Sequence, residues 1–118
     1  MDDATVKQVQ QTIEHVLGKY FTLNDIEFLG TTEDLIRFRI IINSFTFIID
    51  YSTSETTQRY FHNDSSWRVE IKHQNIIECW SGSDIDLDQA LAKAMNYYAN
   101  FYNETIINAS NLYNNYFK

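Results

Sequence analysis

Residues 35–51 read LIRFRIIINSFTFIIDY and contain the pattern that decides the fold. In Leu35–Asn43 apolar side chains recur at every second position, with arginines between them. A period of two places alternate side chains on opposite faces of a β-strand. The polar pair Asn43-Ser44 then predicts a tight turn into a second strand, Phe45–Tyr51. The stretch therefore predicts an antiparallel hairpin with one apolar face.

Three further segments extend the predicted sheet. Ile26–Thr31 precedes the hairpin, Trp67–Lys72 alternates in the same way, and Ile76–Trp80 is predicted to pair with it. Most of the connections are too short to hold a crossover helix, so neighbouring strands should be antiparallel. Cys79 falls in the last of these segments, where a lone cysteine usually acts as a small buried hydrophobe. We therefore expect an antiparallel sheet of four to five strands.

Helical periodicity precedes the sheet. Between Thr5 and Tyr20 apolar side chains recur mostly at spacings of three and four residues, which places them on one stripe of a helix. Asp2 or Asp3 can cap its first turn, because a carboxylate accepts hydrogen bonds from free backbone N–H groups there. The sequence therefore predicts an N-terminal helix with one apolar face.

A second helical stretch follows the sheet, which we expect to end at Ser81-Gly82-Ser83. Asp86 has the position of an N-cap, with Gln89 three residues later as in a capping box. Asn and Ser residues at Asn108–Asn111 predict a bend or break, since both are poor helix-interior residues. The chain is thus predicted to be one α+β domain over residues 1–118. It has an N-terminal helix, an antiparallel sheet and a long C-terminal helix.

Composition limits the class of protein. The chain has 118 residues, 44% of them apolar, and a single cysteine, which fits one globular domain and excludes a disulfide scaffold. The acidic start Met1-Asp2-Asp3 is unlike a signal peptide. The run Ile40–Ile42 is far short of the roughly 20 apolar residues that a membrane span needs. We therefore expect a cytoplasmic protein without membrane association.

The charge is strongly acidic and unevenly distributed. Sixteen Asp and Glu against nine Lys and Arg give a net charge of −7, which disfavours direct nucleic-acid binding. The acids gather in residues 1–35 and 75–104, whereas the segment between them has a slight excess of bases. Two interpretations fit this pattern: an acidic face that binds a basic partner, or an ordinary solvated surface.

The aspartates of Asp84-Ile-Asp86-Leu-Asp88 are the most suggestive local motif. Three alternating carboxylates could bind a hard cation such as Ca²⁺. An EF-hand loop would need Gly and Glu where this chain has Gln89 and Met95. Capping of the following helix explains the carboxylates without an ion, so we predict no metal site.

Catalytic signatures are weak. Cys79 could pair with His73 or His62, but no spacing typical of a metal site or an activated nucleophile occurs. The three glycines are too scattered for a phosphate-binding loop. We therefore predict no catalytic residue, no cofactor and no enzymatic activity.

The last helix carries more aromatic side chains than one buried stripe can hold. Tyr97 and Tyr102 are predicted to contact a partner or a second copy of the chain, because Tyr is enriched at interface hot spots. Alternatively, a bend lets both halves of the helix cover the core. The full set is Tyr97, Tyr98, Phe101, Tyr102, Tyr113, Tyr116 and Phe117.

Phe28-Leu29-Gly30-Thr31-Thr32, followed by Leu35–Asn43 and its partner Phe45–Asp50, provides a local resemblance to a known family. With its acidic, proline-free order of helix, strands and helical tail, the chain resembles small phage-encoded anti-CRISPR proteins that inhibit the Cas9 nuclease. The resemblance covers about a quarter of the chain. It implies that carboxylates replace phosphates on a DNA-binding surface. The implied phosphate mimics are Asp25, Glu27, Glu33, Asp34, Asp84, Asp86 and Asp88.

One departure concerns the C-terminal part, where the acids of such inhibitors can cluster. In this chain, Glu104 is the only acidic residue among residues 89–118.

The sequence therefore predicts a small acidic inhibitor, from a phage or mobile element, that blocks a basic nucleic-acid-binding surface on a larger protein such as a nuclease. An immunity or antitoxin-type protein that neutralises a toxin fits the same charge. The residues are also compatible with a homo-oligomeric structural protein assembled through the aromatic C-terminal helix, and with a small enzyme that uses Cys79 or Asp84–Asp88.

Overall fold

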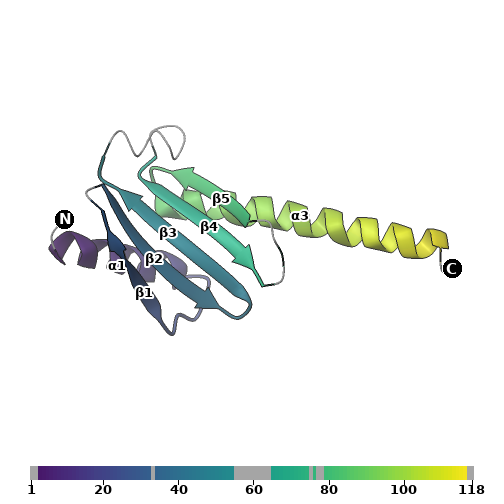
Figure 1. The fold of residues 1–118 in the computed structure, drawn as a ribbon, viewed down its shortest axis with the longest axis horizontal. Helices are drawn as coiled ribbons and strands as arrows, with labels where there is room; N and C mark the ends of the chain where they lie inside the picture. The colour runs from purple at the N-terminus through teal and green to yellow at the C-terminus, as the bar shows by residue number, and fades with distance from the viewer. Residues whose placement is uncertain (1–2, 33, 55–64, 75, 77–78, 117–118) are drawn as a thin grey trace.

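The computed structural model describes residues 3–32, 34–54, 65–74, 76 and 79–116, and in the last range only the backbone of 104–113, 115 and 116. It is a five-stranded antiparallel sheet with a helix before it and a helix after it (Figure 1). The strands are neighbours in their order along the chain, so the predicted α+β architecture is confirmed. The elements are α1 (Asp3–Leu17), β1 (Ile26–Thr31), β2 (Leu35–Ile42), β3 (Phe45–Ser52), β4 (Trp67–His73), β5 (Cys79–Asp84) and α3 (Leu87–Tyr116).

The hairpin between β2 and β3 forms at the predicted position. Ile42 pairs with Phe45, so Asn43 and Ser44 alone make the turn. The φ angle of Asn43 is 55°, in the left-handed region that asparagine tolerates better than most residues. The tight turn predicted from this dipeptide is confirmed.

Alternation along β2, β3 and β4 buries one face of the sheet, as predicted. Each fully buried Ile or Phe on that face contributes about 1.5–3 kcal/mol to folding. The buried strand residues are Ile36, Phe38, Ile40, Phe47, Ile49, Trp67, Val69 and Ile71. Both helices cover this same face (Figure 1). Their buried residues are Val9, Ile13, Val16 and Leu17 from α1, and Leu87, Ala90, Leu91 and Ala94 from α3.

The opposite face of the sheet has no helix over it among the described residues, and we call it the open face (Figure 1). Its side chains are the alternate set of the same strands. They include Glu27, Arg37, Arg39, Ile41, Thr46, Ile48, Asp50, Arg68, Glu70, Lys72, Cys79 and Ser81.

Strand β5 differs from its prediction. It begins at Cys79 rather than Ile76, and it includes Ser81-Gly82-Ser83, which the sequence suggested as the end of the sheet. Gly82 pairs with Val69 on the helix-covered face. A Cβ atom at Gly82 would lie 2.5 Å from the carbonyl oxygen of Ala90 in α3. Gly82 therefore allows α3 to pack closely on β5, and it does not end the strand.

Helix α3 is one continuous element from Leu87 to Tyr116, so the interruption predicted near Asn108–Asn111 is wrong. Asn and Ser lower helix propensity by only a few tenths of a kcal/mol each, which does not break a helix. The N-cap prediction is confirmed, because the helix starts directly after Asp86 and the Ala90 N–H donates to the Asp86 carbonyl oxygen at 3.1 Å. The helix is about 45 Å long and extends past the sheet (Figure 1).

Neither helix, within the described part of the chain, is long and apolar enough to cross a membrane.

Gly82→Ala should destabilise the fold by about 1–3 kcal/mol, because the added methyl group must displace α3 from β5. Ser81→Ala is the matched control, since it introduces alanine at the neighbouring, exposed position of the same strand. Its effect should stay below about 0.5 kcal/mol. Urea unfolding measures both. Equal stabilities would contradict the close packing of α3 on β5 at Gly82.

Candidate functional site

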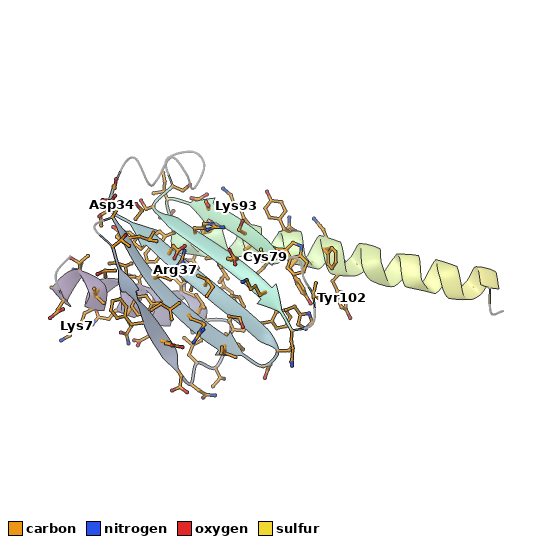
Figure 2. All side chains as sticks on the ribbon, in the orientation of Figure 1. Lys7, Asp34, Arg37, Cys79, Lys93 and Tyr102 are labelled. Carbon is orange, nitrogen blue, oxygen red and sulfur yellow. The ribbon has the colours of Figure 1, made fainter. Side chains whose placement is uncertain are left out.

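The antiparallel order brings several predicted acids to one end of the sheet. Ile36 and Asp84 lie at the two ends of one cross-strand row that passes through β3 and β4. Asp34 comes just before β2 at this end, and Figure 2 shows it beside the connections between strands. Asp86 and Asp88 follow β5 at the start of α3. We call Asp34, Asp84, Asp86 and Asp88 the acidic end.

Two of these four carboxylates are paired with lysines of the same chain. Lys93 Nζ donates to Asp84 Oδ2 at 2.8 Å, and Lys19 Nζ lies 3.4 Å from Asp88 Oδ2. The other oxygen of Asp88 is buried and has no hydrogen-bond partner among the described residues. Two hydrogen bonds to Asp84 hold its pKa below the ordinary value. The one from Lys93 has the larger effect, and the one from the Asp86 N–H has the smaller. The acidic end thus contains both neutralised and uncompensated carboxylates.

The three alternating aspartates of the predicted cation motif are used separately. Asp84 binds Lys93, Asp86 occupies the N-cap position of α3, and Asp88 pairs with Lys19. In the described ranges no three His, Cys, Asp or Glu side chains gather as metal ligands would. The expected capping position is found for Asp86 alone, whereas Asp84 and Asp88 form ion pairs.

The remaining predicted acids lie elsewhere. Asp25 is at the opposite end of the sheet, where it lines a hollow of about 600 Å³ together with Glu14 of α1. Glu27 lies on the open face and accepts a hydrogen bond from Arg39 Nε at 3.0 Å. Glu33 lies outside the described residues. The predicted phosphate mimics therefore do not form one continuous face. Glu14 was missed, because only the fold places this helix residue in the lining of the same hollow as Asp25.

The open face carries a network of charges around one buried carboxylate. Asp50 is 1% exposed and has direct cross-strand neighbours in Arg37 and Arg68. Arg37 donates to both Asp50 oxygens, from Nε at 2.7 Å and from the terminal nitrogen at 3.0 Å. Arg68 lies 3.9 Å from Asp50 and 3.2 Å from Glu70, which also pairs with Lys72. The charges of this face therefore largely cancel one another.

Arg37→Met should lower the free energy of unfolding by about 2–3 kcal/mol, because it leaves the buried Asp50 carboxylate without its two strongest hydrogen bonds. Arg39→Met is the matched control, since Arg39 pairs with an exposed partner, Glu27. Its cost should be below about 1 kcal/mol. Urea unfolding at neutral pH compares them, and an equal loss in both variants would refute the special role of Asp50.

Cys79 is exposed, so its predicted role as a buried hydrophobe is wrong. In the register of β5 with β4, Cys79 pairs with Lys72, so it lies on the open face (Figure 2). His73 lies on the helix-covered face, where its Nδ1 is 3.0 Å from the Tyr98 hydroxyl and its Nε2 is 3.0 Å from Ser44 Oγ. Cys79 and His73 therefore lie on opposite faces. The other candidate, His62, is outside the described residues.

The aromatic side chains at the start of α3 divide into two sets. Tyr98 and Phe101 pack on Trp80, with ring centroids 5.0 and 4.8 Å from it. Burial raises the pKa of Tyr98, and the nearby Tyr102 raises it further. Tyr97 and Tyr102 remain exposed, at 54% and 49%. These two can contact a partner without any change in the fold.

Pairing leaves an excess of uncompensated negative charge. Every Lys and Arg whose side chain the structure describes, except Lys7, forms an ion pair. Several carboxylates in the same part of the chain form none. They are Asp3, Glu14, Asp25, Asp34 and Asp86. The described part of the chain thus offers carboxylates to a partner and almost no unpaired cations.

No protein-family model, curated protein or solved structure matches the chain. Its function is therefore argued from the residues and their geometry.

Lys93→Met should raise the pKa of Asp84 toward the ordinary value of about 3.9, because it removes the main hydrogen bond to that carboxylate. A carboxyl group whose pKa is lowered by folding stabilises the protein fully at pH values above its ordinary pKa. This stabilisation is lost as the pH falls through the pKa of the folded state. Carboxyl ¹³C NMR titration measures the shift. Lys19→Met serves as the control and should leave the pKa of Asp84 unchanged. If Lys93→Met also left this pKa unchanged, the pairing of Asp84 with Lys93 would be excluded.

Proposed function

We propose that this chain is a small acidic inhibitor that binds a basic surface on a larger protein. The observation that supports the proposal is that, among the described side chains, nearly all Lys and Arg form ion pairs while several carboxylates form none. An Arg or Lys of a partner can bind an unpaired carboxylate without first breaking an internal ion pair. Such charges also steer the encounter and select against acidic partners.

Asp25, Asp34 and Asp86 are the strongest contact residues in this proposal, because they form no ion pair with any described residue. Glu27 and Asp88 have exposed lysine or arginine partners, and exposed pairs are worth only about 0–1 kcal/mol. A partner's cations can replace those lysine or arginine side chains at small cost.

The exposed Tyr97 and Tyr102 of α3 add contact area of the kind found in interface hot spots. They extend the proposed surface beyond the carboxylates.

A nucleic-acid-binding protein, such as a nuclease, is the partner class we favour. Surfaces that bind phosphate backbones gather Lys and Arg, and carboxylates at strand connections can occupy the same positions as phosphates. The resemblance to anti-CRISPR inhibitors leads to the same partner. A toxin with a basic active surface fits the same chemistry, and in that case the chain would be an immunity or antitoxin-type protein.

The test begins with the partner that co-purifies with the tagged protein from its host. Raising the salt from about 0.05 to 0.5 M should weaken the complex at least tenfold, because exposed charge pairs are screened. A DNA or RNA duplex should compete with the protein for the partner. An affinity that does not change with salt would refute an electrostatic inhibitor, and the identity of the partner separates the nuclease from the toxin.

A matched pair of variants locates the contact. Asp34→Asn combined with Asp86→Asn should weaken binding by about tenfold or more, while Asn keeps the N-cap of α3. Glu104→Gln combined with Glu70→Gln changes the net charge equally but alters residues outside the acidic end, and should weaken binding less than about twofold. Equal effects would mean that net charge alone, and no particular surface, drives binding.

A further inference from the structure

Strand β1 is at one end of the sheet, so among the described residues only one of its two edges has a neighbouring strand (Figure 1). An unpaired edge presents backbone N–H and C=O groups that can hydrogen-bond to another extended chain. Proteins commonly protect such edges with Lys, Pro or a β-bulge, and Ile26–Thr31 contains neither Lys nor Pro. Its one irregularity is the bulge between Phe28 and Gly30, where Gly30 has a φ of 135°.

The edge strand also exposes apolar surface. Phe28 is 47% exposed and Leu29 is 41% exposed, although Phe28 still contacts Phe38 at a ring-centroid distance of 5.3 Å. A hollow of about 210 Å³ lies between the Leu29–Thr32 segment and Leu35 and Arg37. Side chains of an added strand would find apolar contacts on both faces of β1.

Unpaired carboxylates lie near both ends of this edge. Asp25 directly precedes β1 and shares the hollow of about 600 Å³ with Glu14. Asp34 lies beyond the other end of β1, at the start of β2. Within the described ranges, neither Asp25 nor Asp34 forms an ion pair. The charge at the edge therefore complements a cationic segment.

The same charges argue against a second copy of the chain as the added strand. In an antiparallel pair of two β1 strands, the end of one copy that carries Asp25 would lie beside the end of the other that leads to Asp34. Like charges facing each other across strands are destabilising. A basic strand meets no such repulsion.

We propose that the free edge of β1 binds an extended segment rich in Lys or Arg from the partner, which pairs as a sixth strand. This inference rests on the proposed function and specifies how the partner is held. Backbone hydrogen bonds supply affinity, and the carboxylates of Asp25, Glu14 and Asp34 select the basic segment.

The test uses the full chain and the peptide acetyl-Lys-Val-Lys-Val-Lys-Val-amide at low salt. Saturating peptide should slow amide hydrogen exchange in Ile26–Thr31 by about tenfold or more, as new backbone hydrogen bonds form. The same peptide with all backbone amides N-methylated keeps its charge but has no backbone donors, and it should give no protection.

Protein variants supply the second arm. Leu29→Lys adds a charge that repels the peptide at the edge, and it should weaken binding by about tenfold or more. Ile85→Lys, at a 66% exposed position that follows β5 on the far side of the sheet, is the matched control and should change affinity less than about twofold. Failure of the peptide to protect β1, or equal binding of the N-methylated peptide, would overturn strand addition. The proposed function fails separately, if binding of the host partner is insensitive to salt.

Discussion

The burial of only one face of the sheet is the constraint on which the rest of the structure depends. Apolar and polar side chains alternate regularly along β2, β3 and β4, so the apolar side chains form one layer on one face of the sheet. Both helices cover that layer. The absence of a side chain at Gly82 lets α3 approach β5 closely enough to complete it. Without this approach, the second half of the core would remain open to water.

The burial of one face also places the charged side chains of the strands on the opposite, open face. Arg37, Arg68 and their acidic neighbours occupy the outward positions of adjacent strands, so cross-strand pairing joins them to Asp50 and Glu70. Lysines at the helices pair with two acids of the acidic end. The carboxylates left without an ion pair in the described part of the chain lie in the connections, at Asp25, Asp34 and Asp86, and on α1, at Asp3 and Glu14. The proposed contact surface consists of the charges that the fold leaves uncompensated.

Local periodicity was enough to predict most of the fold, because alternation and helical spacing are properties of neighbouring residues. The sequence located both helices, the hairpin at Asn43 and the inward set of each central strand. It misplaced β5, since the role of Gly82 depends on a helix that follows it in the chain. Cys79 was expected to be buried because lone cysteines usually are, but its pairing with Lys72 places it on the open face. The candidate site was predicted less well. Which acids are neutralised depends on register and helix packing, and only the fold places Glu14 and Asp25 around the same hollow.

The central claim is that the open face is electrically balanced while uncompensated negative charge lies at the connections. Paramagnetic relaxation of backbone amide protons by a cationic and by an anionic nitroxide probe measures the local potential directly, without a partner. We predict the strongest preference for the cationic probe near Asp25, Asp34 and Asp86, and little preference around Arg37 and Asp50. A uniform preference over the whole surface, or the strongest negative potential on the open face, would contradict the account.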